Sequence, residues 1–152
     1  MTETFFYHLE RRSLEDVLPG LIEKTLERGW RALIRCDSSE RAEAIDTLLW
    51  TYDDASFLPH AQQGDGESAR QPVLITVEEG NANAANVMFL VGGAPPPAWD
   101  TVADLTRVVL MFDGRDARML GAARASWKDA KAAGHDVTYW KEMPSGKFEN
   151  QA

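Results

Sequence analysis

Short apolar runs alternate with amphipathic stretches along most of the chain. The apolar runs, bounded by polar residues or glycine, predict buried strands. They cover residues 4–9 (TFFYHL), 30–36 (WRALIRC), 72–77 (PVLITV), 86–91 (NVMFLV), 107–112 (RVVLMF) and 137–140 (VTYW). Helices are predicted at residues 13–28, 39–49, 99–105 and 114–134. Strands that alternate with helices predict an α/β fold in three layers, with a mostly parallel sheet.

The first helix has a clear start signal and one unfavourable residue. Ser13 is suited to cap it, and Glu15 and Asp16 follow in the first turn, where the helix dipole favours acids. Pro19 lies inside the predicted span, where its ring and missing N–H disfavour helix. We therefore expect the helix to bend at Pro19 or to begin later.

Residues 114–134 predict the longest helix, and their residues sort into two faces. At about 100° per residue, one side collects small residues that can lie close on a sheet. These are Met119, Ala122, Ala123, Ser126, Ala130 and Ala133. The opposite strip carries Leu120, Arg124, Trp127, Lys128 and Lys131. Two interpretations of Trp127 stay open: a boundary residue covered by Lys and Arg side chains, or the centre of a binding surface.

Charge favours the binding interpretation. The chain has 16 Lys+Arg and 24 Asp+Glu, a formal net charge of −8. Residues 115–141 instead hold six cations and three acids, a net charge of +3, which leaves −11 for the rest. The acidic remainder would repel a long nucleic acid. An acidic peptide that ends in an aromatic residue and a free carboxylate fits better, with its apolar end on Trp127 and its carboxylates on the cations.

Motifs for catalysis or cofactor binding are not found. The connection after the first strand reads ERRSLED, without the glycines of a dinucleotide fingerprint. His8, His60 and His135 are far apart and lack metal-ligand spacing. Cys36, the single cysteine, lies in an apolar run and is predicted to be a buried free thiol in a reducing compartment. The sequence indicates a binding module without a cofactor or a reaction.

Length and hydropathy bound the organisation of the chain. At 152 residues we expect one domain over residues 1–142, followed by a frayed tail at residues 143–152. No apolar run approaches the ~18 residues of a membrane span. The first residues lack the basic-then-apolar order of a signal peptide. We therefore expect a cytoplasmic protein that does not bind membranes.

The run AIDTLLWTYDDASFLPH carries a resemblance to a known family. Trp50 followed by Ser56-Phe57-Leu58-Pro59-His60, together with TFFYHL and WRALIRC, resembles the chi subunit of bacterial DNA polymerase III. The similarity reaches to Lys141. It implies an α/β fold similar to nucleotide-binding proteins, but without a bound nucleotide. It also implies a role as a clamp-loader accessory that links the polymerase to the acidic C-terminal tail of single-stranded DNA-binding protein.

The resemblance also implies two binding surfaces. Five positions match the family's tail-binding site: Arg124, Trp127, Lys128, Lys131 and Phe112. The family commonly has tyrosine where this chain has Trp127, and some members have lysine where it has Leu120, which predicts weaker tail affinity. Three positions, Trp50, Phe57 and Pro59, match the surface that the family uses for the psi subunit and, in some bacteria, for a helicase. The alternative function is a nucleotide-binding regulator or a small nucleotide-dependent enzyme.

Overall fold

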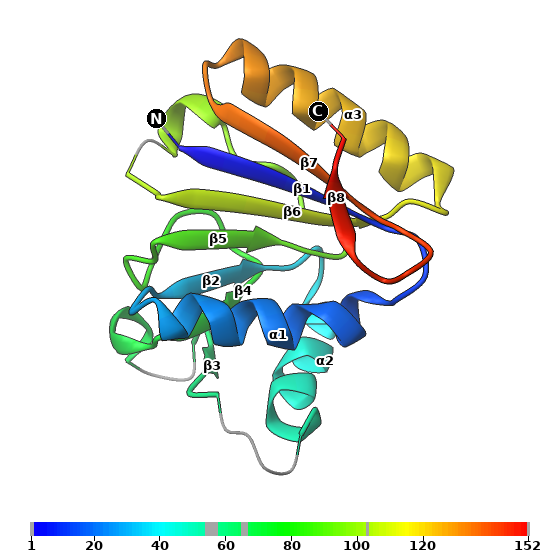
Figure 1. Ribbon diagram of the computed structural model, residues 1–152. Helices are drawn as coiled ribbons and strands as arrows, with labels where there is room; N and C mark the ends of the chain where they lie inside the picture. The colour runs from blue at the N-terminus through cyan, green and yellow to red at the C-terminus, as the bar shows by residue number, and fades with distance from the viewer. Residues whose placement is uncertain (1, 54–57, 65–66, 103, 152) are drawn as a thin grey trace.

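The computed structural model describes residues 2–53, 58–64, 67–102 and 104–151 (Figure 1). Its strands form one sheet in the order β3-β4-β2-β5-β6-β1-β7-β8. They are β1 (Glu3–Leu9), β2 (Ala32–Arg35), β3 (Ala61–Gln62), β4 (Val73–Thr76), β5 (Val87–Leu90), β6 (Arg107–Asp113), β7 (Asp136–Glu142) and β8 (Phe148–Asn150). Every pairing is parallel except that of β7 with β8. The predicted α/β fold with a mostly parallel sheet is confirmed.

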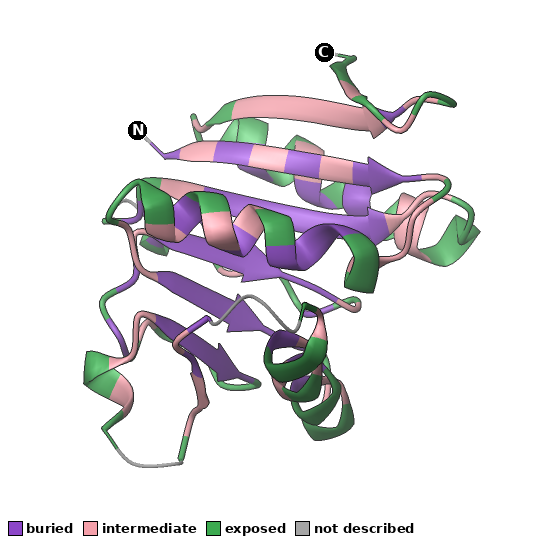
Figure 2. Cartoon of the chain, turned by 60° about the horizontal axis from the view of Figure 1, so that its bottom comes forward, coloured by how far each residue is buried: buried purple, intermediate pink, exposed green. Residues whose placement is uncertain are grey.

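Helices cover both faces of the sheet, which makes three layers. They are α1 (Leu14–Glu27), α2 (Ser39–Thr51) and α3 (Ala117–Ala132), with short 3-10 turns η1 (Ser68–Arg70) and η2 (Trp99–Thr101). Ile34 of β2 belongs to the core under α1 and α2, whereas its neighbour Leu33 belongs to the core under α3. The central strands β2, β4 and β5 are consequently buried along their whole length (Figure 2). Such continuous burial is typical of parallel strands.

The start of α1 follows the sequence signal, and Pro19 does not displace it. Ser13 and Asp16 form a reciprocal capping box, in which each side chain accepts a hydrogen bond from the other's backbone N–H. The helix begins at Leu14, ahead of Pro19, which is buried within it. The expectation of a later start is therefore wrong, since the capping box stabilises the first turn and the proline ring packs in the core.

Two other expectations need correction. The helix predicted at residues 99–105 is reduced to η2. The frayed tail predicted at residues 143–152 contains β8, which pairs with β7 through a turn closed by Met143 N–H donating to the Lys147 carbonyl. The Phe148 ring lies 5.0 Å from the Tyr7 ring, and the Arg12 guanidinium lies over it. These contacts with residues distant in the sequence order the segment, although its local composition does not favour a strand.

Candidate functional site

Helix α3 presents the predicted basic strip on the outside of the molecule. Its N-cap is Asp116, whose carboxylate accepts hydrogen bonds from the Arg118 and Met119 N–H groups. Of the predicted small-residue face, the buried members are Ala123, Ser126 and Ala130. Met119 is half-buried, whereas Ala122 and Ala133 are exposed, since Ala122 lines a cavity beside the helix and Ala133 is its C-cap residue. On the strip, the exposed members are Arg124, Lys128 and Lys131, whereas Leu120 and Trp127 are half-buried.

Trp127 is held in place by the sheet on one side and approached by a cation on another. Its ring lies 5.6 Å from both the Phe6 ring of β1 and the Tyr139 ring of β7, edge to face in each case. Lys131 Nζ lies 5.7 Å from the centre of the same ring. The indole therefore has a fixed orientation, and its exposed remainder lies among the cations of the strip.

Tyr139 connects Trp127 to Phe112, the other aromatic residue assigned to this site. Phe112 is buried near the end of β6, 6.2 Å from the Tyr139 ring and 5.1 Å from the His8 ring. Burial raises the pKa of the Tyr139 hydroxyl, and the charge of Arg124 acts in the opposite direction. Tyr139 is not among the site residues predicted from the sequence. The available signal was VTYW, a strand with aromatic residues directly after the basic helix.

His8 fixes the orientation of Tyr139 through a hydrogen bond to its hydroxyl. Its Nε2 is 2.6 Å from a Glu10 carboxylate oxygen, which accepts only, so this nitrogen carries the hydrogen. Nδ1, 2.5 Å from the Tyr139 hydroxyl, then accepts from that hydroxyl. The backbone of Gly114 passes so close to the imidazole that a Cβ atom there would lie 1.8 Å from Nε2. The observed position of the His8 ring therefore requires glycine at position 114.

We expect Gly114→Ala to lower the free energy of unfolding by about 1–3 kcal/mol, since overpacking must displace the His8 ring. The displaced ring would lose its hydrogen bond with Tyr139. Gly121→Ala is the matched control, because Gly121 is exposed on α3 and a Cβ atom there meets nothing within 4 Å. It should stabilise the protein by up to about 1 kcal/mol through helix propensity. Urea denaturation measures the free energy of unfolding of both variants. Equal effects of the two substitutions would contradict the close packing of Gly114 against His8.

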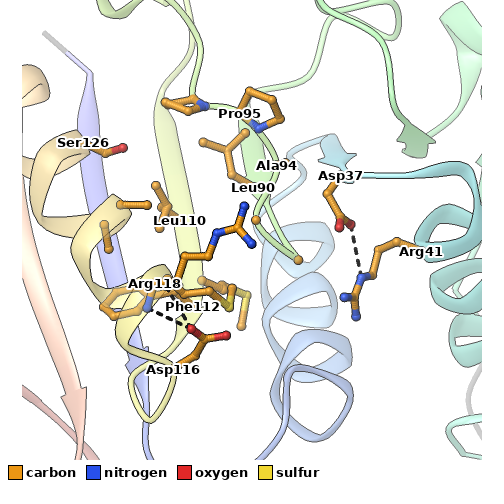
Figure 3. A pocket seen from close by; sticks show the side chains of 17 residues that line it. Asp37, Arg41, Leu90, Ala94, Pro95, Leu110, Phe112, Asp116, Arg118 and Ser126 are labelled. Carbon is orange, nitrogen blue, oxygen red and sulfur yellow. Dashed lines mark hydrogen bonds and ion pairs between the residues drawn. The ribbon is translucent and has the colours of Figure 1, made fainter.

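A cavity of about 560 Å³ lies on the other side of α3 from Trp127, at the carboxyl ends of β5 and β6 (Figure 3). Phe112 lines it, together with Leu90, Leu110 and residues 92–96. Two arginines reach it. Arg41 Nε lies 3.3 Å from an Asp37 oxygen, whereas Arg118 extends from α3 toward the loop that carries Ala94 and Pro95. Phe112 thus lies between the aromatic cluster and this cavity.

The second predicted surface is at the end of α2. Trp50 is 55% exposed, and its ring lies 4.7 Å from the ring of His60. Pro59, next to His60, is half-buried. His60 is buried, with Nδ1 donating to the Leu58 carbonyl at 2.6 Å. The structure therefore brings Trp50 close to the Pro59–His60 segment, while Phe57 lies outside the described residues.

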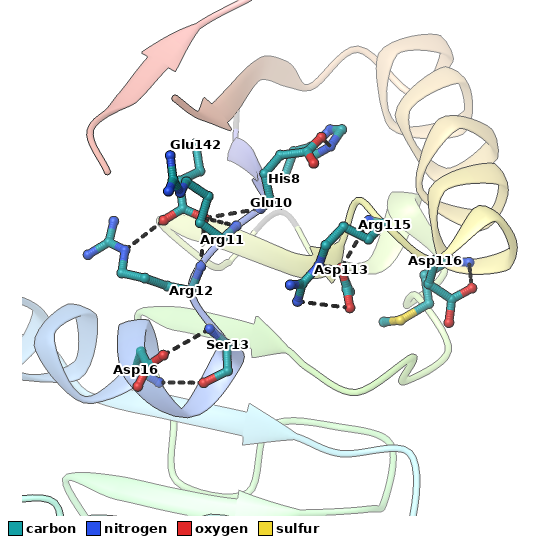
Figure 4. A network of polar contacts seen from close by, with 11 residues as sticks. His8, Glu10, Arg11, Arg12, Ser13, Asp16, Asp113, Arg115, Asp116 and Glu142 are labelled. Carbon is teal, nitrogen blue, oxygen red and sulfur yellow. Dashed lines mark hydrogen bonds and ion pairs between the residues drawn. The ribbon is translucent and has the colours of Figure 1, made fainter. Parts of the chain in front are cut away.

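The loop between β1 and α1 already holds an anion, and that anion belongs to the chain. The Glu142 carboxylate accepts hydrogen bonds from the N–H groups of Glu10, Arg11 and Arg12, at 3.0, 2.8 and 3.1 Å (Figure 4). Arg12 Nε donates to its second oxygen at 2.7 Å. In dinucleotide-binding folds the corresponding N–H groups bind phosphate. Here these donors are engaged by a side chain from β7.

Other site chemistries can be compared with the described part of the chain. Within residues 2–53, 58–64, 67–102 and 104–151, no group of three or more His, Cys, Asp or Glu side chains could hold a metal ion. None of the helices in these ranges is long and apolar enough to cross a membrane. Cys36 is buried, and this burial, with the charge of Asp37, raises the pKa of its thiol to about 12 despite Arg41. The thiol is therefore not a nucleophile at neutral pH.

Comparison with known proteins decides the family. A sequence model of the family described as "DNA polymerase III chi subunit, HolC" matches residues 1–138. The chain belongs to the DNA polymerase III chi subunit family. The match includes α2 with Trp50 and α3 with the basic strip, and it ends one residue before Tyr139. The resemblance that began from Trp50 and residues 56–60 is thereby confirmed.

A relative in Rickettsia prowazekii (strain Madrid E) agrees with this family. It is named "Probable DNA polymerase III subunit chi" and is 30% identical over 91 residues. The aligned part covers 60% of this chain and 55% of the relative, so the chain spans about half the length of the curated relative it matches. The family itself is that of a replication accessory subunit of DNA polymerase III.

Proposed function

We propose that this protein is a non-catalytic adaptor that links the clamp-loader assembly to the acidic C-terminal tail of single-stranded DNA-binding protein. The tail binds along the outer side of α3. One observation carries the proposal: three exposed cations, Arg124, Lys128 and Lys131, share one strip of α3 with a Trp127 ring whose orientation is fixed by the sheet. A role of this kind belongs in the cytoplasm and requires no cofactor, no membrane and no direct contact with nucleic acid.

The cations of the strip are available to pair with the carboxylates of a ligand. None of the acids that the structure describes forms an ion pair with Arg124, Lys128 or Lys131. A tail that supplies several carboxylates therefore gains ion pairs without breaking existing ones. Each exposed pair contributes little. The apolar contact of the terminal aromatic residue with Trp127 must consequently supply most of the affinity, helped by an indole that loses little freedom on binding.

The direct test is fluorescence polarisation with a labelled acidic peptide that ends in an aromatic residue and a free carboxylate. We expect saturable binding that weakens as salt rises. A scrambled peptide of the same composition is the control, because it has the same charge without the aromatic end. Equal binding of both peptides would show non-specific attraction, and no binding of either would contradict the adaptor function.

The alternative, a nucleotide-binding function, is disfavoured by the occupied loop after β1. Glu142 uses the three N–H groups that a phosphate would need, and it is itself an anion that would repel one. The adaptor function instead uses exposed groups that are free to bind. This difference supports the adaptor over a nucleotide-dependent enzyme or regulator.

A second surface, formed by Trp50, Phe57 and Pro59, is proposed to bind the clamp-loader psi subunit or its equivalent, or a helicase. Its support is the exposure of Trp50, one of two large hydrophobic side chains that are exposed in the described part of the chain. A large exposed aromatic beside a proline is typical of a protein interface. Trp50 lies on α2, apart from α3, so both partners can bind at once.

We expect Trp50→Ala to abolish pull-down of that partner while changing the melting temperature by only a few degrees, because most of the ring is outside the core. Leu49→Ala is the matched control on the same helix. Leu49 is 1% exposed, and its loss should cost about 2–5 kcal/mol of unfolding free energy. A Trp50 variant as unstable as the Leu49 variant would show that Trp50 is a core residue.

A further inference from the structure

Arg35 is a buried cation that neither surface uses. It ends β2 on the same face as Leu33 and is 5% exposed. Its Nη2 donates to the Gly80 carbonyl at 3.0 Å. Among the residues that the structure describes, its Nε has no hydrogen-bond partner and its guanidinium has no ion pair. Burial lowers the pKa of Arg35, and the charge of Glu79 acts in the opposite direction.

An arrangement of this kind calls for an anion. A buried guanidinium has five N–H donors, and leaving such a charge unpaired is strongly unfavourable. A carboxylate matches the guanidinium geometry and can accept two of its hydrogen bonds side by side. An anion that pairs with Arg35 must therefore come from outside the described part of the chain. Without such an anion, the unpaired charge lowers the stability of the fold.

The space for such a partner lies directly beside Arg35. A cavity of about 350 Å³ is lined by Arg35 and by the apolar side chains of Met88, Val102 and Leu105. Two exposed acids, Glu79 and Asp104, also line it. These acids disfavour a phosphate or any other multiply charged anion. They favour a molecule that carries a positive group next to its carboxylate.

We propose that this cavity binds a small zwitterion of the α-amino acid class. The carboxylate pairs with Arg35, the ammonium group pairs with Glu79, and an aliphatic side chain packs on Met88, Val102 and Leu105. The cavity lies at the end of β2 and the segment before β6, separate from the α3 strip. This cavity is independent of both proposed protein-binding surfaces and extends the function of the protein to small-molecule recognition.

Three probes of matched shape test the proposal on the full chain. L-leucine carries both charges, 4-methylpentanoate lacks only the ammonium group, and 3-methylbutylamine lacks only the carboxylate. In titrations followed by backbone amide shifts, L-leucine should give saturable changes at Gly80, Met88 and Leu105. The acid should bind about tenfold more weakly, the size of one charged hydrogen bond. The amine should not bind.

Variants assign each charge to its residue. Glu79→Gln should reduce the affinity for L-leucine to that for 4-methylpentanoate, while Asp100→Asn, an exposed acid outside the cavity, should change nothing. Arg35→Met should remove binding of both and keep the fold, since an apolar side chain replaces a buried unpaired charge. Should Arg35→Met not fold, the Glu79 comparison still decides.

Three results would overturn the proposal. One is no saturable shift with L-leucine at tens of millimolar, which would leave Arg35 to water or to Glu79 itself. Another is equal binding of all three probes. The third is leucine binding that survives both Arg35→Met and Glu79→Gln unchanged.

Discussion

Glu142→Gln is expected to lower the free energy of unfolding at neutral pH by about 3 kcal/mol, the size typical of a broken buried ion pair. The Glu142 side chain is completely buried. One oxygen accepts from three backbone N–H groups, and the other accepts from the Arg12 side chain (Figure 4). Glutamine has nearly the same shape, but it has no charge and its amide N–H₂ donates. At least one donor in the β1–α1 loop would then lack a partner.

The effect should depend on pH in a defined direction. Burial alone raises the pKa of Glu142, but hydrogen bonds from Arg11, Arg12 and Glu10 outweigh it and lower the pKa to about 2 from 4.5. The unfolded state therefore binds the proton more readily than the folded state. The stabilisation is fully present above pH 4.5 and is lost as the pH falls toward 2.

Urea denaturation of wild type and Glu142→Gln at several pH values measures this dependence. The difference between them should be largest at neutral pH and should shrink toward pH 2. Glu149→Gln, on the exposed side of the neighbouring β8, is the matched control and should change stability by less than about 0.5 kcal/mol. A difference that does not vary with pH would contradict the role of the charge.

The second large effect concerns binding. We expect Trp127→Ala to weaken binding of the acidic tail peptide by about 2 kcal/mol or more, roughly 30-fold in affinity, as for a central aromatic residue of an interface. Because Trp127 also packs on Phe6 and Tyr139, each variant needs a measured melting temperature. Trp127→Tyr keeps an aromatic surface, and the resemblance to the chi family implies that tyrosine serves at this position. The peptide affinity of Trp127→Tyr should stay within a few-fold of that of the wild type.

The cations around Trp127 should contribute less and respond to salt. Lys131→Ala should cost less than Trp127→Ala, and its effect should shrink as salt rises and screens the charge. Lys147→Ala removes an exposed lysine in the β7–β8 turn, outside the strip, and serves as the control. It should reduce affinity only slightly.

A double-mutant cycle locates the aromatic contact. Removing the last aromatic residue of the peptide should cost as much as Trp127→Ala, and the two losses should not add, because they remove the same contact. Additive losses would place the peptide's aromatic end elsewhere, with the Phe112 cavity as the nearest candidate. Tight binding that is insensitive to salt and survives Trp127→Ala would exclude the α3 strip altogether.

Most of the strands, the three long helices and the exposed basic strip could be predicted from the sequence alone. Apolar runs predict strands because a buried parallel strand needs apolar residues on both faces. The Ser13 cap and the buried members of the small-residue face of α3 are local patterns, in which the residues concerned are within a few positions of each other. The basic strip could be found for the same reason, since residues three or four apart in a helix share one face.

Contacts between residues far apart in the sequence could not be predicted and follow from the folded sheet. β1 lies between β6 and β7, and the register sets Phe6 opposite Tyr139, which completes the support of Trp127. The same arrangement carries Glu142 into the loop after β1 and leaves the buried Arg35 without an ion pair to any residue that the structure describes. Strand order and register follow from the packing of the whole core, to which each local pattern contributes only a part. A lone glutamate near a chain end therefore looks like a solvated charge until the sheet brings three N–H groups to it.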